Sequence, residues 1–454
     1  MGLALGAAFI ASQFSTSPTL IMGIGGVIVF LVSFVSMEAA LYILIFSMLL
    51  SPEIIVGGSP GTEMRGGVTL RAEDLLLVVI GVSWFARNAI FKELGLFLKT
   101  PLNQAIFFYI LSCVVSTGLA IVVGRVVPKT GFFYVVKYIE YFIVFFMVVN
   151  QMNDTDQVKR FVLCLLLTCF IVSIIGIFQI PGGGRVSAPF EGAEGEPNTF
   201  GGYLMFIMAI IGGLFLKFET TRIRLILVFL LITIIPPFLY TQSRASYLGA
   251  LAVCFVLAFM SKRRAILLTL MVIGLIVSPI LLPSTVRDRL AYTFTQPEEA
   301  GQIAVGGVRL DTSLSARVVS YQQAMVDFTK HPILGHGVTG YRFLDAQFPR
   351  VLAETGFIGM VAFLYLLYSI FNLAMTNLQL LEKPLHQGVT IGFLAGFIGL
   401  VVHSLGANTF IIVRIMEPFW FFAGIVVVLP EIEQKYAETH YQTPPRLSGV
   451  IHYG

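Results

Sequence analysis

The chain has 454 residues, of which 57% are hydrophobic and 12% are charged, and its formal net charge is +4 at pH 7. Its mean hydropathy is +0.88. Soluble globular domains carry roughly 25% charged residues, so this composition excludes an ordinary soluble protein and predicts a polytopic membrane protein.

The apolar residues fall in runs long enough to cross a bilayer. A run of about 18 or more apolar residues spans the hydrocarbon core as a helix, because hydrocarbon offers no partner for an open backbone N–H or C=O. We therefore predict an all-α membrane fold with 12 to 14 transmembrane helices, in which segment 3–13 is either a further span or an interfacial helix. The other predicted spans lie near residues 18–36, 38–52, 71–90, 103–124, 130–150, 160–181, 200–217, 222–241, 245–261, 264–283, 351–375, 388–408 and 415–430.

The short loops between these spans alternate in charge. Loops rich in Lys and Arg face the cytoplasm by the positive-inside rule, and only the turn with Arg125 and Lys129 goes against this pattern. The basic residues that set the orientation are Arg87, Lys92, Lys99, Lys159, Arg160, Lys217, Arg222, Arg224, Lys262, Arg263, Arg264, Lys383, Lys435 and Arg446. The segments expected to face outward are 182–199, 241–245, 284–350 and 404–414.

Two outward segments interrupt one continuous membrane domain, 1–454. The first, 182–199, is Gly-rich and is predicted to be a short loop. The second, 284–350, is a long periplasmic or extracellular loop. Apolar residues recur there at helical spacing from Leu314 to Lys330, which predicts an amphipathic helix, and His331-Pro332 ends it because the residue before proline avoids the helical region. A long loop with its own helix is more often functional than a linker.

Arginines on the outer side run against the topological bias, and each invites a reason. A guanidinium offers a planar fork of donors that matches phosphate, which predicts an anion site. The alternative for any one of them is contact with lipid headgroups or a carboxylate. Arg244 is the strongest candidate, because Pro236-Pro237 is expected to break the preceding span and leave Arg244 in a cavity lining. The outer arginines are Arg185, Arg244, Arg317, Arg342, Arg350 and Arg414.

Several outer side chains are candidates for acid–base chemistry. A histidine or carboxylate near the bilayer surface could take a proton from a hydroxyl nucleophile, although a lone His in a Gly-rich turn or a Glu at a helix start is more often structural. The sequence has no Ser/His/Asp pattern, phosphate-binding Gly-Lys-Ser/Thr loop or metal-ligand cluster, which argues against ATP hydrolysis and metalloprotease chemistry. The candidates are Asp345, Glu354, His331, His336 and His403.

Four motifs, in order along residues 130 to 430, resemble the O-antigen ligase and Wzy-type polymerase superfamily. Thr241-Gln242-Ser243-Arg244-Ala245-Ser246 resembles the family's Ser-Arg helix start. Arg317 followed by His331-Pro332-Ile333-Leu334-Gly335-His336-Gly337 resembles its arginine and Gly-rich stretch. The run from Asp345 to Gly359, with Glu354-Thr355-Gly356, resembles its loop signature, and Pro197-Asn198-Thr199-Phe200 matches an upstream element.

The resemblance implies a glycosyltransferase of the outer leaflet, in a bacterial inner membrane, with its active site facing the periplasm or cell exterior. Its donor would be a polyprenyl-pyrophosphate-linked glycan and its acceptor a lipid-linked sugar, with no cofactor, no metal and no nucleic acid partner; a chain-length regulator is a possible partner. Arg244 and Arg317, with Arg185, would hold the pyrophosphate. Asp345 and Glu354 are the catalytic candidates. The further candidates for substrate binding are Arg342, Arg350, Gln347 and His336.

Asp345 stands where ligases typically show a histidine. Asp followed by Gln and an aromatic residue resembles the polymerase branch, so we expect polymerisation of lipid-linked repeat units into O-antigen, capsular or exopolysaccharide. One alternative is a ligase that transfers finished glycan to a lipid core acceptor. Another is a flippase or transporter of lipid-linked oligosaccharide, although such proteins tend to show paired repeats with broken helices.

Overall fold

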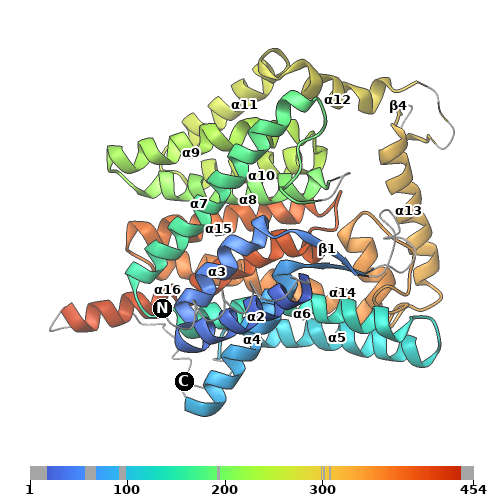
Figure 1. Cartoon of the computed structure of the whole chain (residues 1–454). Helices are drawn as coiled ribbons and strands as arrows, with labels where there is room; N and C mark the ends of the chain where they lie inside the picture. The colour runs from blue at the N-terminus through green and yellow to red at the C-terminus, as the bar shows by residue number, and fades with distance from the viewer. Residues whose placement is uncertain are drawn as a thin grey trace.

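The computed structural model describes residues 18–56, 68–91, 99–191, 195–297, 299, 302–305 and 308–440, and in these residues the chain is an all-α membrane fold (Figure 1). Each of the thirteen spans listed above coincides with a helix, and segment 3–13 lies outside the described residues. These helices are α2 (Pro18–Val35), α3 (Met37–Leu50), α4 (Ala72–Phe91), α5 (Asn103–Val122), α6 (Pro128–Gln151), α7 (Thr155–Gln179), α8 (Pro197–Lys217), α9 (Thr221–Tyr240), α10 (Arg244–Met260), α11 (Arg264–Leu281), α14 (Gln347–Leu380), α15 (Pro384–His403) and α16 (Val413–His440).

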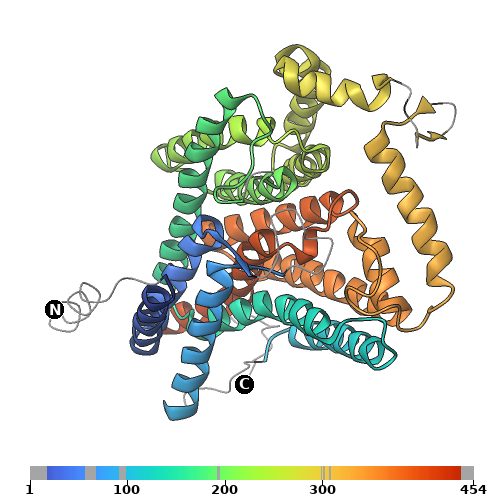
Figure 2. The same ribbon diagram turned by 45° about the vertical axis from the view of Figure 1, so that its right-hand side comes forward.

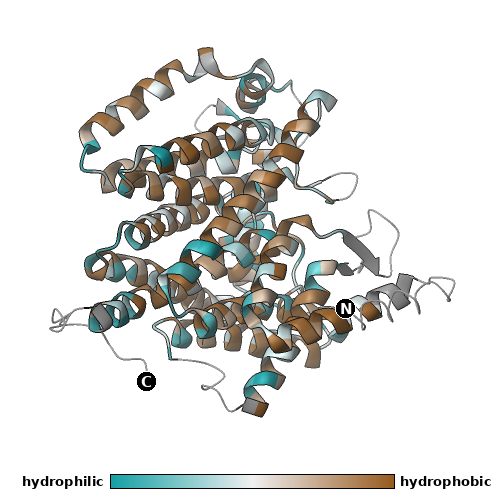
Figure 3. Cartoon of the chain, turned by 60° about the vertical axis from the view of Figure 1, so that its left-hand side comes forward, coloured by the Kyte–Doolittle hydropathy of each residue, from teal (hydrophilic) through white to brown (hydrophobic). Residues whose placement is uncertain are grey.

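Eight of these helices are long and apolar enough to cross a membrane: α5 to α9 and α14 to α16. Shorter apolar stretches lie in α2, α3, α10 and α11. Hydrophobic residues cover the middle of the helices, and hydrophilic residues gather at turns and helix ends (Figure 3). The polytopic all-α prediction is therefore confirmed, while the number of 12 to 14 spans stays a prediction.

The centre of the bundle is the pair α8 and α15, with α16 packed beside them (Figure 2). The two helices approach closely because glycines face each other. A Cβ added at Gly213 would lie 2.3 Å from the backbone oxygen of Gly388 and 2.3 Å from the backbone nitrogen of Gly392. Small residues let membrane helices pack backbone against backbone, so this contact gives the outer ends of α8 and α15 a rigid base.

Short elements join the long helices. The strands β1 (Glu53–Val56) and β2 (Val68–Arg71) form an antiparallel hairpin in which Glu53 pairs with Arg71, and β3 (Ala304–Val305) pairs with β4 (Val308–Arg309). The sequence did not indicate either hairpin. The remaining elements are η2 (Ile180–Gly182), α12 (Ser284–Thr295), α13 (Thr312–Phe328) and η3 (Thr409–Ile411).

The long segment between α11 and α14, which we call the arch, extends away from the bundle. From the end of α11 the chain runs through α12 and the small β3–β4 hairpin, then returns along α13 to α14 (Figures 1 and 2). The amphipathic helix predicted over 314–330 is confirmed as α13, which ends at Phe328, before His331-Pro332. The helix α12 was not expected from the sequence.

One local prediction was wrong. Pro236-Pro237 does not break its span, since both prolines lie inside α9, which continues to Tyr240. The chain turns instead at Thr241–Ser243, where the N–H of Thr241 still donates to the Pro237 oxygen at 3.0 Å and Gln242 has a left-handed φ of 51°. A proline lacks the N–H donor of its own nitrogen but keeps its carbonyl acceptor, and the last turn closes through the residues that follow the two prolines.

Candidate functional site

The N-terminal ends of α8 and α10 meet through their motif residues. The Ser243 hydroxyl accepts from the Ser246 N–H at 3.3 Å and so caps α10, and it donates to the Asn198 amide oxygen at 2.7 Å. A serine is a preferred N-cap because its oxygen satisfies one of the open N–H groups of the first turn. This cap fixes the first residue of α10, Arg244, beside the start of α8.

Arg244 extends from that helix start to the arch. Its Nη1 lies 2.7 Å from Oδ2 of Asp311, whose side chain is 2% exposed. The other oxygen of Asp311 accepts from the Leu314 N–H at 3.0 Å and caps α13. One carboxylate therefore begins α13 and ties it to α10.

Arg317, one and a half turns further along α13, makes a second ion pair. Its Nη2 lies 2.9 Å from Oδ2 of Asp345, and the Asp345 side chain is 42% exposed. Both residues line a pocket of about 250 Å³ between α13 and the chain before α14. The other residues that line it are Ala316, Ser320, Tyr321, Phe343, Leu344, Ala346 and Pro349.

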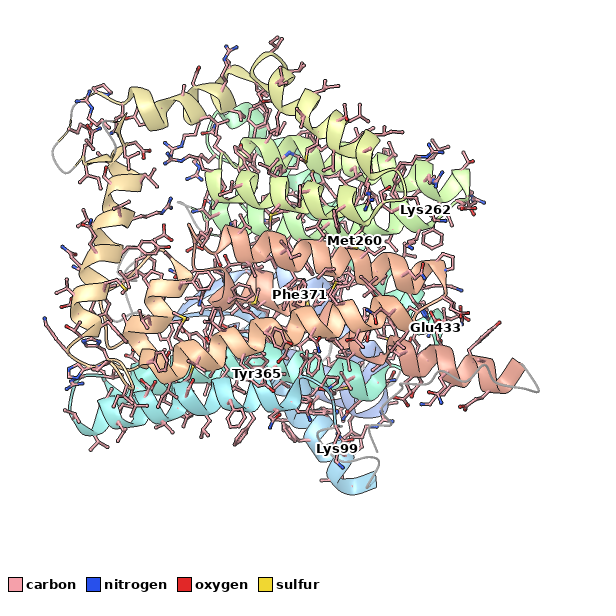
Figure 4. All side chains as sticks on the ribbon, turned by 180° about the vertical axis from the view of Figure 1, so that it is seen from behind. Lys99, Met260, Lys262, Tyr365, Phe371 and Glu433 are labelled. Atoms are coloured by element: carbon pink, nitrogen blue, oxygen red, sulfur yellow. The ribbon has the colours of Figure 1, made fainter. Side chains whose placement is uncertain are left out.

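Two more arginines complete the group. Arg185 donates from Nε to the Thr241 oxygen at 2.9 Å, in the turn before Arg244. Burial lowers the pKa of Arg185, and so do the positive charges of Arg289, Arg244 and Arg317, so these three side chains lie within electrostatic range of Arg185. We refer to Arg185, Arg244, Arg289 and Arg317 as the arginine cluster. Nitrogen-tipped side chains gather between the arch and the bundle in Figure 4.

Carboxylates of the described residues neutralise only part of the positive charge of the arginine cluster. Arg244 and Arg317 have the two aspartate partners given above. The Nε atoms of Arg289 and Arg317 are buried without a hydrogen-bond partner in the described part of the chain. Among the described residues, four guanidinium groups lie with two paired carboxylates, and buried donors that lack a partner there favour an anionic ligand.

The loop between α15 and α16 closes the site from the side of the bundle. Tyr321 of α13 donates to the Leu405 oxygen at 2.9 Å, and the Asn408 amide donates to the Leu344 oxygen at 2.6 Å. Gln347 is fully buried, and its side-chain oxygen accepts from the Phe410 N–H at 3.0 Å. Gln347 therefore positions the chain that carries Asp345, rather than lining the pocket.

Backbone hydrogen bonds join the turn 331–340 to the start of α14. The N–H groups of His336 and Gly337 donate to the oxygens of Ala353 and Glu354 at 2.9 and 2.8 Å, and that of Phe357 donates to the Pro332 oxygen at 2.8 Å. Gly356 interrupts the helix with φ 66° and ψ −163°. The two Gly-rich motifs of the sequence thus form one interlocked structure behind the pocket.

Several predicted site residues belong to this interlock. Arg350 and Glu354 form a buried pair with Nε and Oε1 3.2 Å apart, and the same oxygen accepts from the Thr339 N–H at 3.2 Å. His336 binds the Ala353 oxygen through Nδ1 at 3.0 Å. Their geometry favours positioning over direct contact with substrate, and the catalytic assignment of Glu354 stays a prediction.

Arg342 and Arg414 have other surroundings. Arg342 lies over the ring of Tyr341, 5.4 Å from its centroid, and Tyr341 donates to Asp327 at the far end of α13 from Arg317. Arg414 is fully buried, 3.3 Å from Glu191. Neither arginine lies with Arg244 and Arg317 in the arrangement described above.

Sequence reasoning missed Arg289, Asp311 and Tyr321. Arg289 stands in a short polar helix that carried no helical signal, and Asp311 pairs with a residue of another helix. A signal did exist for Asp311, because Asp before an amphipathic run is a typical N-cap. Among the described residues, no group of three or more His, Cys, Asp or Glu side chains is arranged to hold a metal ion.

Comparison with known proteins finds a similarity in the part of the chain that carries most of this site. Residues 226–364 match the model of the family described as O-Antigen ligase. The match contains Arg244, Arg289, Asp311, Arg317 and Asp345. No curated protein matches the chain. On this match, the segment that carries Arg244, Arg317 and Asp345 is similar to the O-antigen ligase family.

Proposed function

We propose that the chain is an outer-leaflet glycosyltransferase that polymerises polyprenyl-pyrophosphate-linked oligosaccharide units. The observation that carries this proposal is the arginine cluster. It combines four guanidinium groups from four segments with two aspartates that pair with Arg244 and Arg317. A diphosphate brings enough negative charge and enough oxygens for several such forks at once.

Binding of the donor diphosphate would change the groups to which the arginines of the cluster donate hydrogen bonds. The diphosphate oxygens replace the aspartate oxygens on Arg244 and Arg317, and the buried Nε atoms of Arg289 and Arg317 supply further donors. This exchange leaves the Asp345 carboxylate free to turn toward the pocket that it already lines. Donor binding would therefore prepare the site for the acceptor.

The chemistry needs one bond made and one broken. The acceptor hydroxyl oxygen attacks the anomeric carbon, the bond from that carbon to the diphosphate oxygen breaks, and the diphosphate leaves with the electron pair. The arginines stabilise the charge that develops on the leaving group, which is usually the largest contribution in such reactions. The hydroxyl proton passes to Asp345, the carboxylate nearest to the pocket among the candidates.

The pocket suits an acceptor sugar. Its volume is about 250 Å³, and it combines the aromatic rings of Tyr321 and Phe343 with the Asp345 carboxylate. Aromatic faces pack on the apolar face of a sugar ring, while a carboxylate accepts from its hydroxyls. A terminal sugar held there lies beside Arg317, and hence beside the donor diphosphate.

A ligase is the second candidate, because the matching family model is described as O-Antigen ligase. Both reactions use the same donor and differ in the acceptor. Asp345 at the position where ligases typically show histidine is the feature that leads us to place polymerisation first.

The test is incubation of the purified protein, in lipid, with a polyprenyl-pyrophosphate oligosaccharide. Longer lipid-linked products are expected from the wild type and are expected to be lost in Arg244→Ala and Arg317→Ala. Lys262→Ala, at the opposite end of the bundle (Figure 4), is the control and should retain activity.

Three other outcomes are distinguishable in the same assay. Transfer of the glycan only to an added lipid core acceptor would establish the ligase reaction instead. Movement of intact substrate across the bilayer without a new glycosidic bond would establish a transporter. Normal polymer from both arginine variants would refute the role of the cluster.

A further inference from the structure

A second group of charges lies inside the membrane domain, on other helices. The helices α4 and α16 both contact α6, and all three lie in the lower half of Figure 1. Glu73 and Asp74 stand in the first turn of α4, Glu140 in α6 and Glu417 in α16, and their exposed fractions are 0%, 5%, 8% and 0%. We refer to these four residues as the acid cluster.

Three cations of the described part of the chain face the acid cluster. Lys137 Nζ lies 3.3 Å from Asp74 Oδ2. Arg71 of β2 lies 3.7 Å from Glu73, and Arg414 lies 3.9 Å from the same oxygen. Arg414 also serves other acceptors, because it donates to the oxygens of Pro189 and Ser51 at 3.0 and 3.1 Å.

A fifth carboxylate competes for Arg414. Glu191 lies 3.3 Å from its Nη1, and burial raises the pKa of Glu191 to about 7 against the opposing effect of Arg414. Among the described residues, five carboxylates therefore face three cations in a buried region. Uncompensated charge in such a region costs far more than charge at a surface, so the excess negative charge must be neutralised.

Of these five carboxylates, Glu417 is the one that the surroundings favour in its protonated, neutral form. Both of its oxygens are buried without a hydrogen-bond partner, and so is Oε1 of Glu140. An ionised carboxylate demands donors on both oxygens. The neutral acid needs far less, so the absence of partners in the described chain selects the protonated form.

We propose that Glu417 and Glu140 form a proton-binding site, which takes its protons from the aqueous phase. The ligand is a proton rather than a metal ion, because no three carboxylate or other ligating side chains among the described residues converge as a metal site requires. The charged groups that face the site are Glu73, Asp74 and Arg71 from α4 and β2, Lys137 from α6, Arg414 from α16, and Glu191 from the loop after η2.

The proton also determines what Arg414 holds. Arg414 and Glu417 are three residues apart on one helix and so share a face. While Glu417 is neutral, Arg414 stays with Glu191 and the Pro189 oxygen, which fastens the loop that also carries Arg185. An ionised Glu417 would offer Arg414 a third carboxylate, on its own helix, and weaken that hold on the loop.

The test is infrared difference spectroscopy on the purified full chain in lipid, in which a protonated carboxylic acid gives a C=O stretching band separate from that of a carboxylate. The wild type is expected to show this band at neutral pH, and Glu417→Gln is expected to lose the contribution of one acid. Glu433→Gln is the matched control in the same helix. Glu433 accepts from the N–H groups of Glu382 and Lys383 at 2.9 and 3.1 Å, so its replacement should leave the acid band unchanged.

Each of the remaining outcomes supports or refutes the proton-binding site. If Glu417→Gln does not fold, Glu140→Gln and a pH titration of the wild-type band replace it, and the band should fall in the variant and disappear only at alkaline pH. A wild type without the acid band would refute the proposal. A band that sodium ions remove at constant pH would show a metal cation at this site and refute it as well.

Discussion

At the scale of single residues, Arg289 has the most to gain from an anionic ligand. Its Nε is buried and has no hydrogen-bond partner in the described residues, and it carries no paired aspartate there. A hydrogen bond between charged groups contributes about 1.5–3 kcal/mol, which corresponds to about 10- to 100-fold in affinity. We expect Arg289→Ala to weaken binding of a polyprenyl diphosphate by that factor, measured by titration of the purified protein.

The control for this experiment lies two residues away. Arg287→Ala removes an equal charge from the same helix, α12, without removing a member of the arginine cluster, and should change the affinity little. Arg289→Lys keeps the charge but loses the planar fork, so it should recover only part of the loss. Equal weakening by Arg287→Ala and Arg289→Ala would mean that only the general charge of α12 matters.

Residue chemistry predicted part of the site and missed its partners. Arg244, Arg317 and Asp345 stood out because of their charge and place, and the structure brings Arg317 and Asp345 within 2.9 Å. The bond from Arg244 to Asp311 could not be foreseen, since it joins two helices whose relative position no local pattern encodes. The Arg350–Glu354 pair could have been, because residues four apart on a helix are neighbours.

At the scale of elements, the interlock between turn 331–340 and α14 depends on glycine. A Cβ at Gly356 would lie 2.4 Å from the Ile333 oxygen, in a backbone with φ 66°. Strain of this kind costs roughly 1–3 kcal/mol. We expect Gly356→Ala to lower the thermal unfolding midpoint and the glycan transfer rate together.

A matched glycine shows whether the effect is local. Gly274 lies inside α11, and a Cβ there would meet nothing within 4 Å. Gly274→Ala should leave the midpoint unchanged or raise it, because alanine favours the helix by up to about 1 kcal/mol. A midpoint for Gly356→Ala equal to that of the wild type would contradict the structural role of the interlock.

Element prediction succeeded where one signal dominated. Apolar length alone located α5, α7 and α14, because a membrane imposes it over twenty or so residues. It failed where the signal was short or conflicting. The α12 helix and the β1–β2 hairpin carry no long pattern, and Pro236-Pro237 predicts a break although the helix closes its last turn beyond them.

At the scale of the whole molecule, the charge pattern makes a prediction about orientation. Lys262 lies at the end of the bundle opposite to α12 and α13 (Figure 4), so the two ends should face different compartments. A cysteine at Gln322, on an exposed face of α13, is expected to react with a membrane-impermeant maleimide on intact spheroplasts. A cysteine at Lys262 should react only after the membrane is opened.

Cys254→Ala provides the background for this labelling, because Cys254 is the exposed cysteine among the four. Reaction at position 262 and protection at position 322 would reverse the proposed orientation.

Composition predicted the class of the molecule, a polytopic membrane protein, but it did not predict the contacts that hold distant segments together. Contacts such as that from Gln347 to Phe410 join distant segments through single hydrogen bonds, which leave no trace in hydropathy.

The aspartates on Arg244 and Arg317 also bear on selectivity against the surrounding membrane. Phospholipid headgroups with one phosphate are present in vast excess over any lipid-linked sugar. Arginines without a carboxylate partner at the bilayer surface would bind these headgroups. A ligand with a single negative charge gains little by displacing a carboxylate that is already well placed, as Asp311 is at 2.7 Å. A diphosphate can displace two. Under the proposed function, the resident carboxylates would therefore act as a charge threshold, which disfavours phospholipids with one phosphate and admits the rare molecule that carries its sugar on two phosphates.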